Sequence, residues 1–151
     1  MRRSIDRLNS GDPGMFLRLA SPDVAIAFPG DNSWATMYRP VVKGREAHLT
    51  HRGIDECRGF AERFVENHNQ FVIEDILVNG PPWNTRVVLR LHDFIAGVDG
   101  DDYNNRVVAF LTIRWGRLVG WEDYEDTERI AAWDATVRGR NAAHVAGGID
   151  R

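Results

Sequence analysis

The sequence is poor in cysteine, in long apolar runs and in excess positive charge, and each shortage excludes a class of protein. Cys57 is the only cysteine in 151 residues, so no intramolecular disulfide can form and a reducing compartment is expected. No stretch approaches the roughly 20 apolar residues that a transmembrane helix needs. The 19 basic and 22 acidic residues are mixed along the chain and give a net charge of -3, so no basic face is expected to bind nucleic acid.

The start of the chain also lacks the apolar stretch of a secretory signal, because Met1-Arg2-Arg3-Ser4-Ile5-Asp6 runs from positive charge directly into an acidic residue. We therefore expect a cytoplasmic protein with neither a membrane nor a nucleic acid as partner. The length and the 43% hydrophobic content allow one substantial core. Residues 1–135 are predicted to form one domain, and residues 136–151, which lack apolar periodicity, a disordered tail.

Turn residues and hydrophobic periodicity predict helices first and strands later. A short helix is expected to follow Asp12-Pro13, and apolar or small residues at three- and four-residue steps predict the main amphipathic helix from Gly44 to about Val65. Asp126 or Thr127 can cap a last helix. The expected strands cover residues 24–28, 71–78, 85–95, 104–115 and 118–124. This order favours an α+β domain with an antiparallel meander over a parallel βαβ arrangement.

Strand parity groups three polar side chains. Successive side chains on a strand point to opposite faces, so Arg90 and His92 share one face, and Asp123 shares a face of the last strand with Trp121. If these faces form the concave side of one bent sheet, Arg90, His92 and Asp123 meet in an aromatic-lined hollow. A guanidinium, an imidazole and a carboxylate in a poorly hydrated pocket suit acid/base chemistry. A structural ion pair with a hydrogen-bonded histidine would use the same residues.

The run Gly120-Trp121-Glu122-Asp123-Tyr124-Glu125-Asp126 resembles the segment of limonene-1,2-epoxide hydrolases in which Gly-Trp-x-Asp-Tyr-x-Asp carries the general-base aspartate. This resemblance implies that Asp123 is the base. Arg90-Leu91-His92 falls on the Arg-x-Asp strand motif of that family, and Tyr103-Asn104 on a Tyr-Asn pair that opens the next strand. The likeness covers about residues 85–129 and is collinear across the helices. It implies the nuclear-transport-factor-2-like superfamily and its SnoaL-like branch, whose α+β fold is a cone: a strongly bent antiparallel sheet wrapped around helices.

The chain departs from two enzyme families of this superfamily. His92 stands where the epoxide hydrolases have their acidic proton donor, and Ile26-Ala27-Phe28 stands where they have a Tyr-x-Asn that holds the water, which these side chains cannot do. Phe28 precedes Pro29 at the place where ketosteroid isomerases carry their catalytic aspartate. SnoaL-like polyketide cyclases use an aspartate of the last strand region with polar neighbours, and Asp123 with His92 is most similar to that arrangement.

The resemblance also implies a pocket for a small apolar molecule. Trp34 and Tyr38 belong to the loop that overhangs the mouth of the cone in this fold, and we expect them to close over the ligand. No cofactor is expected. His51 and Asp55 are four residues apart on the expected main helix but have no third ligand nearby, so no metal site is expected. The expected ligand-contacting residues are Phe28, Trp34, Tyr38, Asn105, Val107 and Trp121.

Three hypotheses for the function stay open. In the first, an enzyme of the cyclase, isomerase or hydrolase type acts on a small apolar substrate, with Asp123 as base, His92 as acid and Arg90 orienting both. In the second, the same pocket binds a hydrophobic molecule without chemistry. In the third, an interaction protein has a concave face that its own side chains fill.

A homodimer through the outer face of the sheet is a further expectation. Monomers seldom expose apolar patches beyond a few hundred square ångströms, so a patch on this face needs a second subunit over it. Arg106, Thr112 and Arg114 would form its polar rim. The side chains expected in the patch are Val87, Leu89, Leu91, Val108, Phe110, Leu118 and Tyr124.

Overall fold

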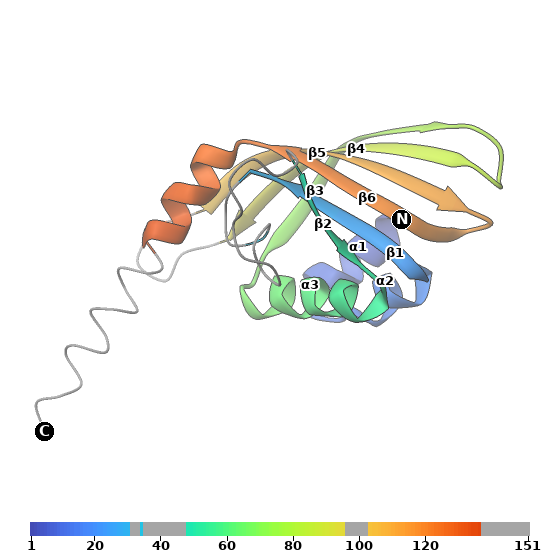
Figure 1. Cartoon of the computed structure of the whole chain (residues 1–151). Helices are drawn as coiled ribbons and strands as arrows, with labels where there is room; N and C mark the ends of the chain where they lie inside the picture. Colours follow the sequence, from blue (N-terminus) through green and yellow to red (C-terminus); the bar gives the residue numbers. More distant parts are fainter. Residues whose placement is uncertain (31–33, 35–47, 96–102, 137–151) are drawn as a thin grey trace, which may run out of the picture.

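The N-terminal helices pack against one face of a curved six-stranded sheet (Figure 1). The computed structural model describes residues 1–30, 34, 48–95 and 103–136. The helices are α1 (Arg2–Asn9), α2 (Gly14–Leu19) and α3 (Ile54–Glu66), and a further helix covers residues 127–136. The strands are β1 (Ala20–Pro29), β2 (His48–Arg52), β3 (Gln70–Asn79), β4 (Thr85–Ile95), β5 (Tyr103–Arg114) and β6 (Arg117–Glu125). The predicted α+β class and cone-like architecture are confirmed.

The strand order in the sheet is β2-β1-β6-β5-β4-β3. All neighbouring strands are antiparallel except β1 and β6, which run parallel and join the two N-terminal strands to the four later ones. The parallel pair was not predicted. β6 runs alongside β1 and carries Asp123. This pairing therefore holds the polar end of β6 next to Phe28 at the end of β1.

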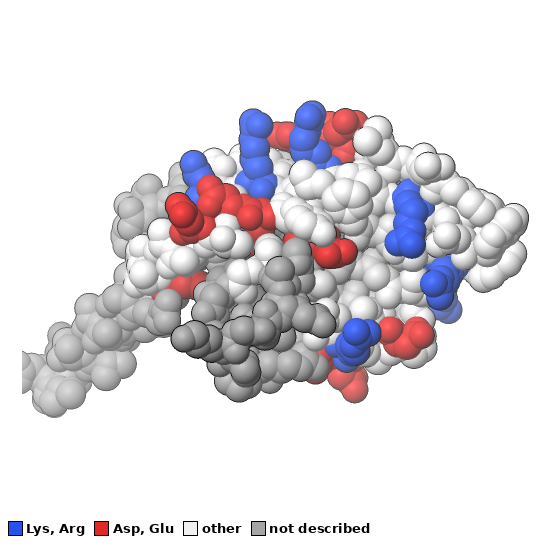
Figure 2. Space-filling view, turned by 45° about the horizontal axis from the view of Figure 1, so that its top comes forward, with Lys and Arg blue, Asp and Glu red and all other residues white. Residues whose placement is uncertain are grey.

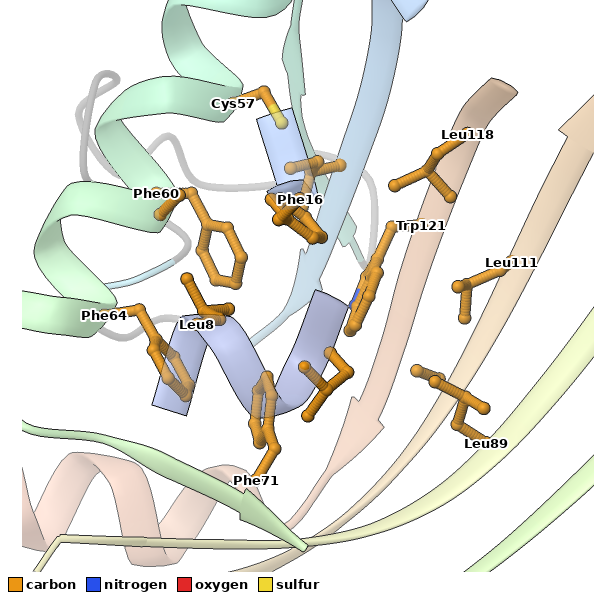
Figure 3. Close-up of a cluster of buried hydrophobic side chains, with 14 of the residues drawn as sticks. Leu8, Phe16, Cys57, Phe60, Phe64, Phe71, Leu89, Leu111, Leu118 and Trp121 are labelled. Carbon is orange, nitrogen blue, oxygen red and sulfur yellow. The ribbon is translucent and has the colours of Figure 1, made fainter. Parts of the chain in front are cut away.

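The core lies between the helices and the facing side of the sheet. Phe16 of α2 and Phe60 of α3 contact Trp121 of β6 through their rings, and Leu89 and Leu111 point toward them from β4 and β5 (Figure 3). Cys57, on the inner side of α3, belongs to this cluster. Burial raises the pKa of its thiol to about 12, so it packs as a small apolar side chain, as expected.

The main helix is shorter than predicted, because residues 48–52 form a strand. Thr50 fitted the helical spacing but pairs with Ala27 in an antiparallel ladder. Gly53, with a φ of 89°, then turns the chain into α3, which begins at Ile54. Residues 44–47 of the predicted helix lie outside the described residues. Pairing with a distant strand overrides the local helical periodicity here.

The outer face of the sheet is also composed differently from the prediction. Val108, Phe110 and Tyr124 lie on it as expected. Leu118 does not, because Thr112 pairs with Gly120 and Ile113 with Leu118, which leaves Val119 as a bulge that turns Leu118 inward. The other apolar side chains predicted to lie outside are buried in the core: Val87, Leu89 and Leu91.

The outer face is hollowed into an open trough of about 960 Å³. Strand register places most of its lining on the side of the sheet that points away from the helices, with Phe110 between Val88 and Glu122. The trough is deep at Ala25 and Ala27, because their side chains are small. Figure 2 shows uncharged surface on this side of the molecule, between groups of charged side chains. Phe110 is 49% exposed and Leu77, which also lines the trough, is 63% exposed.

A side-chain cap fixes the start of the last helix. Oδ1 of Asp126 accepts hydrogen bonds from the backbone N–H groups of Glu128 at 3.1 Å and Arg129 at 3.3 Å, which confirms Asp126 as the cap of the last helix. None of the helices in the described ranges is long and apolar enough to cross a membrane. The predicted tail lies outside the described residues from residue 137 onward.

The C-terminus of α3 is closed by a Schellman motif. The backbone N–H of Asn69 donates to the carbonyl of Phe64 and that of His68 to the carbonyl of Val65, both at 3.0 Å. His68 occupies the left-handed position of this motif with a φ of 58°. The motif therefore fixes the backbone of Asn69 where α3 passes into β3.

Because a left-handed φ is unfavourable for histidine, His68→Gly should raise the free energy of unfolding by about 0.5–1 kcal/mol. Urea unfolding followed by circular dichroism measures this. Asn67→Gly is the matched control, since Asn67 has a right-handed φ of -78° and glycine there should lower stability. A destabilising effect of His68→Gly would contradict the role given to this position.

A buried carboxyl cluster as candidate active site

Arg90 and His92 lie on the face of β4 that points away from the helices. Arg90 pairs across the sheet with Val108, and Val108 pairs with Tyr124, so Arg90 and Tyr124 share the outer face. Asp123 precedes Tyr124 on β6 and points to the opposite face, where it is 3% exposed. The prediction that Arg90, His92 and Asp123 meet in one pocket is wrong.

The two outward side chains have other partners. Nε of Arg90 lies 3.1 Å from Oε2 of Glu74 on β3, in an ion pair whose guanidinium is largely exposed. Nε2 of His92 lies 2.8 Å from Oδ1 of Asn104 on β5. Both contacts join neighbouring strands at the surface, and an exposed pair of this kind contributes about 0–1 kcal/mol to stability.

Hydrophobicity decides which face of β4 turns inward. Leu89 and Leu91 are both 0% exposed, and Leu89 points toward the helices in Figure 3. A strand with one buried face directs its alternating apolar set into the core, and on β4 that set is the one without Arg90 and His92. The next position of the inward set after Leu91 is Asp93.

Asp93 is the residue that sequence reasoning missed. It lies one position beyond His92 and therefore on the opposite, inward face of β4. Asp93 is buried and lines the same cavity as Asp123. Continuing the apolar alternation of β4 to its end would have found this carboxyl group.

The partly open cavity between sheet and helices has a volume of about 20 Å³, which is room for about one water molecule. Half of its described lining residues are aromatic. Figure 3 shows Phe60 and Phe64 of α3 and Phe71 of β3 directed toward the same space as Trp121. The described lining residues are Phe28, Trp34, Phe60, Phe64, Asn69, Phe71, Asp93, Val107, Asp123 and Glu125.

Burial in this apolar space raises the pKa of Asp93 to about 7. A hydrogen bond from Asn69, whose Nδ2 lies 3.2 Å from Oδ1 of Asp93, and the neighbouring His92 oppose the rise. Burial also raises the pKa of Asp123, although the indole N–H of Trp121 donates to its Oδ1 at 2.5 Å and favours the ionised form. Asp93 adds to the rise, because two buried carboxylates repel each other.

Glu125 is the third carboxyl group of the cluster and is only partly buried. Its pKa is raised by burial first and then by the charges of Asp123 and Asp93. Groups that disfavour each other's ionisation share protons, so the cluster holds both an ionised and a protonated carboxyl near neutral pH. Such a cluster can accept a proton at one atom and donate one at another.

Tyr103 and Asn105 of β5 border the cluster. Nδ2 of Asn105 donates to the hydroxyl of Tyr103 and to the backbone carbonyl of Asp126, both at 3.1 Å. Burial raises the pKa of Tyr103, and the negative charge of Asp93 adds to it, so the phenol stays protonated. These bonds tie β5 to the start of the last helix at the wide end of the sheet.

The residues predicted to contact a ligand fall into three groups. Phe28, Trp34 and Val107 line the cavity. Trp121 and Asn105 are buried on the same face, where Trp121 donates to Asp123. The remaining one, Tyr38, lies outside the described residues. Their contacts with a ligand stay predictions.

Trp34 and Asn69 are the two described lining residues outside the helices and strands, and Trp34 supplies an aromatic ring. Its ring packs against Phe28 and Phe60, and the guanidinium of Arg63 lies 4.4 Å from the ring centroid. Its carbonyl oxygen lies 3.2 Å from Nε2 of His51. These contacts place the indole between α3 and the cavity.

His51 is a buried residue of β2 and not a helix-surface residue as predicted. Its Nδ1 lies 3.6 Å from Oε2 of Glu56 on α3. Asp55, which follows His51 by four residues, is exposed on α3. Within residues 1–30, 34, 48–95 and 103–136, no three His, Cys, Asp or Glu side chains are grouped to hold a metal ion.

Comparison with known proteins agrees with this architecture. An NTF2-like protein of unknown function from Burkholderia pseudomallei K96243 superposes with a TM-score of 0.66 at 18% identity, over 88% of this chain and 92% of the other. A "putative polyketide cyclase" from Xanthomonas campestris pv. campestris gives 0.56 at 18% identity, over 89% and 90%. A "putative isomerase" from Rhodopseudomonas palustris gives 0.62 at 14% identity, over 86% and 89%. At these identities the likeness establishes the fold alone.

No curated protein matches the chain. The profile of the SnoaL-like domain matches residues 1–121, which include α1 to α3, the first five strands and the first part of β6. The chain therefore belongs to the SnoaL-like domain family, within the NTF2-like superfamily that its sequence resembles.

Proposed function

We propose that this SnoaL-like domain is an enzyme that moves protons on a small apolar molecule, in a reaction of the cyclase, isomerase or hydrolase type. The observation that carries the proposal is the pair of buried carboxyl groups of Asp93 and Asp123, which line one aromatic-walled cavity. Ionisable groups are seldom buried among aromatic rings unless they are paired or used. Two of the fold relatives are named for reactions of this class, a cyclisation and an isomerisation.

In the proposed mechanism Asp123 is the general base and Asp93 the general acid. Burial and the charge of Asp93 raise the pKa of Asp123, so its carboxylate binds a proton readily, and the N–H of Trp121 holds that carboxylate in place; we therefore propose that Asp123 takes a proton from the substrate. Asp93, when protonated, donates its proton to an oxygen atom of the substrate, as a neutral buried carboxyl can. One proton arrives and one leaves, so the charge of the cluster is the same before and after. Arg90 and His92 take no part, because they lie on the other face.

A substrate larger than water has to displace an aromatic side chain from the cavity of about 20 Å³. Phe28, Phe60 and Phe71 belong to strands and a helix whose backbones are fixed by hydrogen bonds. We propose that the indole of Trp34 exchanges its contacts with Phe28 and Phe60 for contacts with the apolar part of the bound molecule. This retains the predicted role of Trp34 as a ligand contact.

The nearly filled cavity is what the third hypothesis, an interaction protein, predicts. A ligand-binding domain without chemistry is the second candidate, and the aromatic side chains that line the cavity favour it. In that case the carboxyl groups serve only to hydrogen-bond a ligand, and their ionisation has no kinetic effect. The two candidates differ in what happens after binding, so a binding measurement alone does not separate them.

Asp93→Asn should lower kcat about 100-fold or more on a substrate found among epoxides, terpenoids and polyketide intermediates, because the amide cannot donate an acidic proton. His92→Asn, one residue away but on the outer face, is the matched control and should change kcat less than threefold. Product formation measured by liquid chromatography gives both rates. Binding across the whole panel without turnover would establish the second candidate, and equal losses in both variants would contradict the role of Asp93.

We also propose that the domain is a homodimer whose subunits meet through the outer trough. The trough draws side chains from all six strands, and its exposed apolar members Leu77 and Phe110 need cover. Tyr124 contacts Phe110 edge-on with ring centroids 5.6 Å apart and extends the apolar surface along β6. Arg52 and Glu122 line the same trough and supply opposite charges for a self-complementary interface.

A further inference from the structure

Asn69 is a buried residue whose backbone and side chain are both held in place. Its backbone is held by the Schellman motif at the end of α3, and its side chain is part of a residue that is 2% exposed. Nδ2 donates to Oδ1 of Asp93 at 3.2 Å and lies 3.5 Å from Oδ2. The other end of the amide, Oδ1, is buried and accepts no hydrogen bond within the described part of the chain.

Asn69 also separates two hollows. It lines the cavity that contains Asp93 and Asp123, and it lines a second hollow of about 350 Å³. Among the described lining residues it is the only one common to both. The second hollow lies where the end of α1, the end of α3 and the start of β3 meet: Leu8, Asn9, Ser10, Gly11, Val65, His68, Asn69 and Gln70.

Within the described part of the chain, Asn69 is also the only group that donates a hydrogen bond to Asp93. The other ionisable groups that act on Asp93 do so through their charge or are buried beside it. They are Asp123 and Glu125 on β6, Tyr103 on β5 and His92 on β4. Removal of Asn69 therefore takes away the one hydrogen bond that a described residue donates to the Asp93 carboxyl.

A side-chain amide matches a carboxyl group in both of its protonation states. It donates from nitrogen to a carboxylate, and after a half turn about its last bond it accepts at oxygen from a carboxylic acid. A buried acceptor without a partner is unfavourable. The free Oδ1 of Asn69 is thus the atom to which a protonated Asp93 donates once the amide has turned.

We propose that Asn69 is a positioning residue that holds the carboxyl of Asp93 in both its ionised and its protonated state and shields it from the water of the second hollow. This deepens the acid/base function proposed above, and only its catalytic consequence rests on that function. The contact itself exists in the protein without substrate.

The test is a titration of Asp93 by ¹³C NMR of its carboxyl carbon in the substrate-free protein. Asn69→Leu keeps the approximate volume and removes the donor, so Asp93 should bind its proton about tenfold more tightly than in the wild type. Gln70→Leu is the matched control, because Gln70 lines the second hollow and its side chain donates to the carbonyl of Asn9, while Asn69 is the donor to Asp93. It should leave the titration of Asp93 unchanged.

A second measurement uses the wild type alone and decides the matter if Asn69→Leu does not fold. The side-chain amide resonances of Asn69 should titrate with the same midpoint as the Asp93 carboxyl. Amide resonances that ignore this titration, or equal shifts of Asp93 in Asn69→Leu and Gln70→Leu, would overturn the proposal. Since neither experiment needs a substrate, absence of turnover would reject the proposed enzyme and leave this inference standing.

Discussion

Asp123→Asn should stabilise the protein at neutral and alkaline pH while it abolishes turnover. The folded state raises the pKa of Asp123 and Asp93 above the value of about 3.9 in an unfolded chain, so it binds protons more tightly than the unfolded state does. The free energy of unfolding of the wild type is therefore highest at low pH, below the unfolded pKa. It should fall as the pH rises from about 4 through the folded pKa of Asp93 at about 7.

An asparagine at position 123 cannot ionise, so no charge is buried there. Its neighbouring carboxyl groups then ionise without repulsion from that position. Above pH 7 the variant should be more stable than the wild type by on the order of 2–4 kcal/mol, and near pH 4 the difference should disappear. Urea unfolding at pH 4, 7 and 9 measures this. Glu62→Gln, which removes an exposed carboxyl from α3, should leave the pH dependence as it is in the wild type. A wild type whose stability rises with pH over this range would refute the burial argument.

The same substitution should lower kcat about 1000-fold or more, since the amide keeps the shape of the carboxylate but cannot accept a proton. Stability gained together with activity lost is the signature of a group that is buried for its chemistry. Loss of both would indicate a structural role for Asp123, and gain of stability with unchanged kcat would remove it from the mechanism.

Much of the strand half of the fold was predictable, because its signals are local. The turn residues at Asn79-Gly80-Pro81-Pro82 separate β3 from β4, and Gly116 closes the turn between β5 and β6. The helix cap at Asp126 was predictable for the same reason. Each of these features depends on residues within a few positions of one another.

The errors arose where distant parts of the chain decide the structure. β2 exists only through its pairing with β1, and the bulge at Val119 appears only when β6 is laid against β5. α1 escaped notice because a helix of eight residues has too short an apolar face, Ile5 and Leu8, to show a period.

The wrong face of β4 has a different cause. Placing Arg90 and His92 inside satisfied an expected catalytic set but required Leu89 and Leu91 to be outside. Burying two leucines is worth about 1.5–3 kcal/mol each, whereas a buried arginine without a close partner is strongly unfavourable. Both terms favour the face observed, and Asp93 follows from the same parity.

The observed face of β4 decides which substitution can test the dimer. Leu89→Asp cannot test it, because a charge at a side chain that is 0% exposed should unfold the domain. Phe110→Asp is the appropriate substitution, because Phe110 lies in the trough and is already 49% exposed in one subunit. The fold should survive, as circular dichroism can verify.

Phe110→Asp should convert a homodimer into a monomer of about 17.1 kDa, measured by light scattering at micromolar concentration. A two-fold interface contains the substituted position twice, so the change introduces two aspartates into an interface that has lost two aromatic rings. Glu62→Lys, a charge change on the helical side of the molecule, should leave the dimer intact. A wild type of monomeric mass would refute the proposed interface outright, and a dimer that persists in Phe110→Asp would place the interface away from the trough.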